Sequence, residues 1–137
     1  MSTPTRELKA APFYQEHLPT RVLHHGDGCM KMEIDFTDLH LNAAGVVHGG
    51  VIAALLDVAS AGGGSATSTD AERAYGVTMS LTVNFIKGAV AGPAKIEGVA
   101  IGGGRKTKFV EGKMHDSTGS LVATSTSTVK VIDLAKS

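Results

Sequence analysis

The sequence predicts an α+β fold in which one antiparallel sheet of five to six strands wraps around a central helix. Three observations predict this fold. One long apolar segment has helical character, an alternating apolar and polar segment precedes it, and four alternating segments follow it with short turns between them. Consecutive strands joined by short turns pair antiparallel, and a sheet with one apolar face buries that face against a helix.

Size and composition limit what the chain can be. Its 137 residues, 42% of them hydrophobic, suit a single domain spanning residues 1–137. The 13 basic and 13 acidic residues balance, so no nucleic-acid partner is expected. Cys29 is the only cysteine, which excludes an intrachain disulfide. The longest apolar run, 51–59, is far shorter than the ~20 residues of a membrane span, so we expect a soluble, cytoplasmic protein that binds no membrane.

The N-terminal part is predicted to hold a short helix and a strand. Residues 5–18 are weakly amphipathic and are followed by Pro19, which cannot continue a helix. Residues 28–36 alternate between apolar and charged side chains, which is the period of a half-buried strand. A loop over 37–47 then leads to the central helix.

The central helix is predicted from about Gly49 to Ser65, and its glycine run Gly62–Gly64 is expected to weaken its end. Residues 77–85 show the clearest alternation in the chain. The expected elements after the helix are a strand over 77–85, a turn at Gly92-Pro93, and strands over 95–101, 106–116 and 120–132 joined by hairpins at Gly102–Gly104 and Asp116–Gly119.

Asp57 lies in the middle of this helix, which is otherwise apolar on nearly every face. Such a helix is normally buried, and taking an isolated carboxylate out of water costs several kcal/mol. Asp57 is therefore interpreted as a functional group. The alternative interpretation is that it caps a turn or pairs with a lysine of a neighbouring element.

The helix begins with His48, Gly49 and Gly50. Glycines there allow a ligand to approach the unpaired amides of the first turn, where the helix dipole favours negative charge on a substrate oxygen. His48 and Asp57 are nine positions apart, which is ~13 Å along an ideal helix and ~180° around it. They cannot act on the same atom within one chain, so the spacing predicts a dimer in which Asp57 of one subunit faces the helix start of the other.

One set of motifs resembles a known family. The chain carries Asn42-x-x-Gly45-x-x-His48-Gly49-Gly50, then Asp57, then Gly76-Val77-Thr78 at the start of a strand. These residues resemble the hotdog-fold acyl-CoA thioesterases of the phenylacetate-degradation type, with a compatible strand order from about residue 20 to 132. The resemblance implies hydrolysis of an acyl-CoA thioester to a free acid and coenzyme A. It also implies a homodimer or a homotetramer built as a dimer of dimers, with each site at a subunit interface and no cofactor, since coenzyme A is part of the substrate.

The resemblance also implies catalytic roles. Asp57 corresponds to the catalytic carboxylate, which acts as a general base on water or as a nucleophile. Gly49 corresponds to the residue whose backbone N–H polarises the thioester carbonyl. Asn42 and His48 correspond to residues that orient the substrate and the attacking water, and Thr78 to a hydroxyl that helps the carboxylate to hold water. A thioester has a good leaving group, so a base and well-placed donors suffice without a metal.

Substrate binding is expected at Gly50 in the first turn of the helix and at Arg105 and Lys106. These two basic residues follow a glycine run where the family places contacts to the coenzyme A phosphates. The alternative for them is a solvated hairpin turn. His24, His25 and His115 lack the spaced partners of a metal site, and no metal is expected.

Two other functions compete with hydrolysis. One is a non-catalytic acyl-CoA-binding or regulatory module on the same fold, which would gain nothing from a costly buried carboxylate. The other is a hydratase or dehydratase, which is disfavoured because those enzymes pair a histidine with a carboxylate in a different arrangement. The sequence does not choose the acyl group, the role of Asp57 as base or nucleophile, or a dimer over a tetramer.

Overall fold

A computed structural model describes residues 6–7 and 12–134. The strands of the described residues form one antiparallel sheet in the order β1-β2-β3-β5-β6-β7-β4. Their bounds are β1 Arg6–Glu7, β2 Thr20–Gly26, β3 Cys29–Phe36, β4 Ala74–Phe85, β5 Gly92–Gly103, β6 Thr107–His115 and β7 Leu121–Asp133; the helices are α1 Pro12–Glu16 and α2 Gly49–Ser65, with 3-10 turns at Asp38–His40 and Ala71–Arg73. The predicted α+β architecture is confirmed, with six strands of seven or more residues and the two-residue β1.

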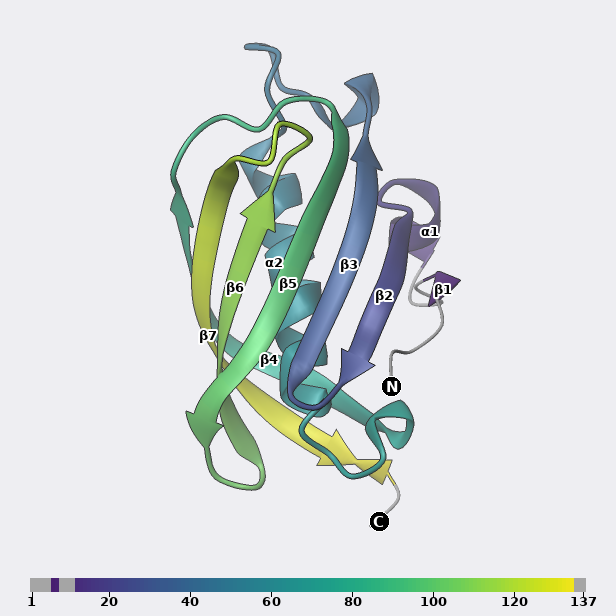
Figure 1. The fold of residues 1–137 in the computed structure, drawn as a ribbon, viewed down its shortest axis with the longest axis vertical. Coiled ribbons are helices and arrows are strands. Elements are labelled where there is room, and N and C mark those ends of the chain that lie inside the picture. Colours follow the sequence, from purple (N-terminus) through teal and green to yellow (C-terminus); the bar gives the residue numbers. More distant parts are fainter. Residues whose placement is uncertain (1–5, 8–11, 135–137) are drawn as a thin grey trace.

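Helix α2 lies behind the sheet in Figure 1, and the strands curve around it. Its side chains Leu55, Leu56 and Ala59 are fully buried in the main hydrophobic core. The glycine run at its end does not interrupt the helix. A Cβ at Gly63 would lie 2.6 Å from the carbonyl oxygen of Gly98 in β5, so this glycine is what lets the helix press directly onto the sheet.

The two edges of the sheet differ. The short β1 forms one edge and pairs with β2. The 12-residue β4 forms the other edge and pairs only with β7 among the described strands. Several of its large apolar side chains are exposed; they are Tyr75, Val77, Met79 and Phe85. A long apolar edge with unpaired backbone groups is a template for pairing with another strand.

A β-bulge at Met79 changes the faces of β4. Thr78 pairs with Val129, but Ser80 pairs with the adjacent residue Thr128, so one extra residue is inserted into β4. Thr78 therefore lies on the helix side of the sheet, the side to which Leu81 also belongs. Strict alternation, as the sequence pattern predicts, would place Thr78 on the opposite face from Leu81.

Three other expectations need correction. Of the helix predicted over 5–18, the described residues contain α1 (Pro12–Glu16), which starts at a proline as is typical of a first helical turn, and residues 6–7 form β1 instead. Residues 8–11 lie outside the described residues. The sequence pattern also did not predict β2 (Thr20–Gly26), where a register shift between Val22 and His24 disrupts the alternation. Gly92 and Pro93 already belong to β5 rather than to a turn.

The segment before α2 is held by hydrogen bonds. The amide of Val47 donates to the carbonyl of Ala89 at 2.9 Å, and the amide of Val90 donates to the carboxylate of Asp116 at 3.3 Å. These bonds tie the loop between β4 and β5 to the start of the helix and to the β6–β7 turn. Within the described part of the chain, no helix is long and apolar enough to cross a membrane.

Candidate active site

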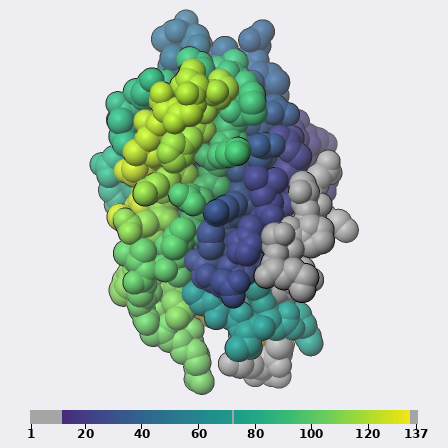
Figure 2. Space-filling model, viewed as in Figure 1, coloured from purple at the N-terminus to yellow at the C-terminus, as the bar shows by residue number. Residues whose placement is uncertain are grey.

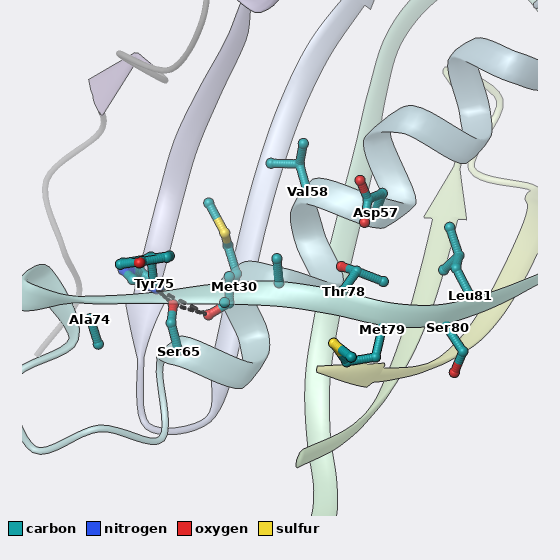
Figure 3. Close-up of a pocket in the computed structure, with 14 residues that line it drawn as sticks. Met30, Asp57, Val58, Ser65, Ala74, Tyr75, Thr78, Met79, Ser80 and Leu81 are labelled. Atoms are coloured by element: carbon teal, nitrogen blue, oxygen red, sulfur yellow. Dashed lines mark hydrogen bonds between the residues drawn. The ribbon is translucent and has the colours of Figure 1, made fainter. Parts of the chain in front are cut away.

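Asp57 and Thr78 line an open groove of about 630 Å³ between α2 and β4. Figure 3 shows Asp57 on the helix above Thr78 on the strand, with Tyr75 and Ser65 towards the other end of the groove. Most of the lining side chains are apolar or small; they are Met30, Val58, Ala61, Gly62, Ala74, Tyr75, Gly76, Met79 and Leu81, with His25, Ser65 and Ser80. The groove therefore presents a carboxylate and a hydroxyl in mostly apolar surroundings.

Asp57 is partly buried. Among the described residues it forms no ion pair and accepts no hydrogen bond, so the alternative of a lysine partner finds no support there. Burial raises the pKa of the nearby Tyr14 phenol, and the negative charge of Asp57 raises that pKa further. The Thr78 hydroxyl oxygen is buried without a hydrogen-bond partner. Such an atom costs free energy unless water or a ligand satisfies it, so the Thr78 hydroxyl is a polar group of the groove that can bind water or a ligand.

The start of α2 carries a second polar group. His48 is the N-cap, and its Nδ1 accepts a hydrogen bond from the Gly50 amide at 2.8 Å. In a neutral imidazole the proton then resides on Nε2, which makes this exposed nitrogen a donor. The Gly50 amide is used by the cap, whereas the Gly49 amide donates to no described residue. Gly49 therefore offers the unpaired N–H of this helix start.

Asn42 lies in the loop before α2 and is exposed. Its side-chain oxygen accepts hydrogen bonds from the amides of Ala44 at 2.9 Å and Val46 at 3.3 Å. The oxygen thus shapes its own loop, and the two N–H donors of the side chain remain for a ligand.

The two groups of polar residues are far apart within one chain. Gly49 and Asp57 are eight residues apart on α2, which is about 12 Å along the helix. Thr78 lies in the first half of β4, and Phe85, whose ring lies next to Gly49, is at the end of β4, roughly 20 Å away along the strand. Among the described residues, the lining of the Asp57 groove includes neither Asn42 nor His48 nor Gly49.

Arg105 and Lys106 lie elsewhere, in the β5–β6 hairpin that projects from the lower end of the molecule in Figure 2. Both are exposed and line a separate hollow of about 610 Å³. Its other lining residues are Thr67, Ser68, Thr69, Lys108, Val131 and Asp133. The hollow adjoins the far end of the Asp57 groove, because Asp133 pairs with the groove residue Ala74 across β7 and β4.

His25 also lines the groove, although no sequence motif indicated it. Its Nε2 lies 2.9 Å from the Ser65 hydroxyl and 3.0 Å from the Gly62 carbonyl oxygen, so it ties β2 to the end of α2. These partners are 37 and 40 residues away in the chain, and no local spacing indicates the contact. Lys108 lines the same hollow as Arg105 and Lys106, although the sequence pattern did not single it out.

An antiparallel sheet curved around one long helix is the hotdog fold, and its groove with a carboxylate suits a hydrolase. The chain belongs to the thioesterase superfamily, whose family model matches residues 44–123. Membership of this family supports thioester hydrolysis as the general class of activity. The expected resemblance to hotdog-fold thioesterases is confirmed.

Individual relatives agree with this family. SSO2140 of Saccharolobus solfataricus, whose name proposes an esterase, is 31% identical over 85% of this chain and 81% of its own. The Escherichia coli PaaI protein of the phenylacetic acid degradation operon has the same fold, with a TM-score of 0.77 at 17% identity over 90% of this chain and 86% of its own. The Streptococcus mutans protein smu.793, solved bound to acetyl CoA, has a TM-score of 0.70 at 25% identity over 82% and 88%.

Proposed function

We propose that the protein hydrolyses acyl-CoA thioesters at a site shared by two copies of the chain. The observation that carries this proposal is the partly buried Asp57, which has no described ion-pair partner and lies in a groove beside the unsatisfied Thr78 hydroxyl. A carboxylate kept unpaired in such surroundings is available to react.

The exposed edge strand supports a site that two copies of the chain complete. Identical strands that pair antiparallel are related by a two-fold axis. With that axis near Leu81, the Phe85 end of one β4 lies opposite the Val77–Thr78 region of the other. Gly49 lies next to the Phe85 ring, and Asp57 shares a groove with Thr78. Pairing of the two edges therefore brings the helix start of one subunit to the carboxylate of its partner, as the helix spacing predicts.

The chemistry follows from this arrangement. The Gly49 N–H, aided by the Nε2–H of His48, binds the thioester oxygen and stabilises the negative charge that develops on it. Asp57 of the partner subunit either takes the proton of a water held with Thr78, or attacks the carbonyl carbon to give an anhydride that water then hydrolyses. In both routes the C–S bond breaks, the thiolate of coenzyme A leaves and takes a proton, and the acid is released.

The coenzyme A arm is proposed to follow the groove towards the basic hollow, where Arg105 and Lys106 bind phosphate oxygens. The acetyl CoA seen on smu.793 supports a coenzyme A ester as the ligand class. The proposed assembly is a homodimer that pairs again into a tetramer, in the cytoplasm.

The first experiment measures free thiol released from acyl-CoA esters by the wild type and by Asp57→Asn. We expect the substitution to lower kcat by at least 100-fold, since general base catalysis contributes about 10²- to 10⁴-fold. The exposed Asp70→Asn is the matched control and should retain full activity. Binding of acyl-CoA by the wild type without any thiol release would instead support the non-catalytic module.

The second experiment tests the shared site. Asp57→Ala and Gly49→Pro, each expected to lower kcat by about 100-fold or more alone, are combined in a heterodimer isolated with two different affinity tags. One of its two sites then contains an intact carboxylate and an intact helix start, so about half of the wild-type activity should return. If each site were built within one chain, the heterodimer would stay inactive, which would disprove the shared site.

A further inference from the structure

Phe85 occupies a position that neither the sequence motifs nor the proposed chemistry uses. It ends β4 on the helix side of the sheet, and its ring atoms Cε1 and Cζ lie 3.4 and 3.5 Å from where a Cβ on Gly49 would be. A side chain added at position 49 would therefore be in ordinary van der Waals contact with the ring, which places the ring next to the first turn of α2. The ring therefore stands beside the unpaired Gly49 amide.

The ring is exposed but its backbone is fixed. Phe85 keeps 56% of its surface exposed. The next amide, Ile86, donates to the Val122 carbonyl at 2.9 Å, and the following loop is bonded through Ala89 to Val47. Exposing half of an aromatic ring forfeits hydrophobic stabilisation, and exposed apolar surface next to a polar site commonly marks a binding surface.

The direction of the substrate follows from the two hollows. The groove runs from Asp57 to Tyr75 and Ala74, and the basic hollow begins beyond it, where Asp133 pairs with Ala74. A coenzyme A arm laid along the groove has its phosphates in the hollow. The carbon chain of the acyl group then extends from the carbonyl carbon in the opposite direction, towards the helix start that binds the carbonyl oxygen.

We propose that Phe85 of one subunit packs against the acyl group held at the partner subunit's Asp57 and limits the size of that acyl group. This inference rests on the proposed thioesterase function and its shared site. The substrates it favours are thioesters with a compact apolar acyl group, and bulky acyl groups are excluded by the ring rather than by lack of affinity for coenzyme A.

The test compares kcat/KM for acetyl-CoA, hexanoyl-CoA and a branched or aromatic acyl-CoA in the wild type, Phe85→Ala and Phe85→Leu. Removing the ring should raise the ratio of kcat/KM for bulky over small acyl groups by about 10-fold or more, because even one methylene in a fitted pocket changes discrimination by about 10- to 200-fold. Phe85→Leu should lie in between. Ile86→Ala, a neighbour that is 53% exposed, is the matched control and should leave the ratio unchanged.

The outcomes separate this inference from the proposed function. A wild type that releases no thiol from any ester contradicts the function itself. An active wild type whose acyl preference is the same in both Phe85 variants, or shifts equally in Ile86→Ala, overturns the role of Phe85. A rise in KM of Phe85→Ala that is the same for all esters would also overturn the role of Phe85, because the ring would then contact the coenzyme A arm rather than the acyl group.

A heterodimer shows whether the Phe85 ring acts on the acyl group bound at the Asp57 of its own chain or at the partner subunit's Asp57. Phe85→Ala is combined with Asp57→Ala and purified with two tags. Its one intact carboxylate belongs to the chain without the ring, and the other chain supplies the ring. We expect wild-type acyl preference from this heterodimer, whereas the preference of Phe85→Ala would show that the ring acts within its own chain and would overturn the proposal.

Discussion

Glycines lie at both ends of helix α2, but the two ends are held in different ways. At the C-terminal end, a Cβ on Gly63 would collide with the Gly98 backbone and a Cβ on Gly64 would lie 2.8 Å from Val129. At the N-terminal end, a Cβ on Gly49 would only touch the Phe85 ring. The first pair of glycines allows close packing, whereas Gly49 keeps an amide accessible.

The supports of the two ends also differ. The C-terminal end rests on the buried sheet, and the N-terminal end is fixed by hydrogen bonds from His48 and from the loops around Val47 and Val90. The stability that apolar packing gives the C-terminal end does not depend on pH, whereas the stability from hydrogen bonds to the Asp116 carboxylate does. One helix thus combines an anchored C-terminal end with an N-terminal end available for chemistry, and three substitutions test this difference.

The largest effect is expected at the anchored end. Gly63→Ala should lower the free energy of unfolding by about 3 kcal/mol or prevent folding, because the added methyl group meets backbone atoms of β5 that cannot move aside. Urea unfolding measures this loss. Gly102→Ala, at a glycine with open space around it, is the matched control and should change stability little. Equal stability of the two variants would contradict the packing role of the glycine run.

An effect on catalysis without loss of stability is expected at the other end. Gly49→Pro removes the amide proton and adds the proline ring, which is well tolerated at the first helical position and suits the ψ of 132° at the preceding His48. We expect kcat to fall about 10²- to 10³-fold with little change in melting temperature. Gly49→Ala keeps the proton and should retain most of the activity. Full activity of Gly49→Pro would exclude this amide as the carbonyl donor.

The smallest effect concerns the hydrogen bonds that support the helix start. Burial alone would raise the pKa of Asp116, but hydrogen bonds from Thr118, Val90 and Ser120 outweigh it and lower that pKa below its ordinary value. A lowered pKa in the folded state means that the ionised group stabilises the fold above its unfolded pKa of about 3.9, and that this contribution is lost as pH falls through the folded value.

Asp116→Asn should therefore cost about 1 to 2 kcal/mol at neutral pH. The difference in unfolding free energy from the wild type should shrink as the pH is lowered below about 4. Urea unfolding across this pH range measures both values. A difference that stays constant down to the lowest pH would show that the carboxylate charge does not support this loop.

Much of the fold could be predicted because its strongest patterns are local. The helix bounds Gly49–Ser65 follow from a segment of apolar and small residues interrupted only by Asp57 and Ser60, and the hairpins after β5 and β6 follow from their turn residues. The missing strand β2 could not be predicted, because it buries only Thr20 and Val22 and carries two histidines where alternation would show. Its stability comes from pairing with β3, which is a tertiary effect.

The candidate site divides in the same way. The helix spacing between His48 and Asp57 argues for two copies from the sequence alone. The position of Phe85 beside Gly49 could not be foreseen, because contacts between residues 36 positions apart depend on how β4 crosses the helix. Nor does the sequence show that His48 uses its Nδ1 for its own helix cap and so leaves Nε2 as the donor.

The bulge at Met79 makes the site sensitive to strand length as well as to side-chain chemistry. Deleting that one residue would leave every polar group of the candidate site in the chain, yet it would swing Thr78 through half a turn relative to Leu81 and away from the carboxylate. Among related chains, an insertion or deletion in this strand would therefore be as damaging as losing the hydroxyl itself.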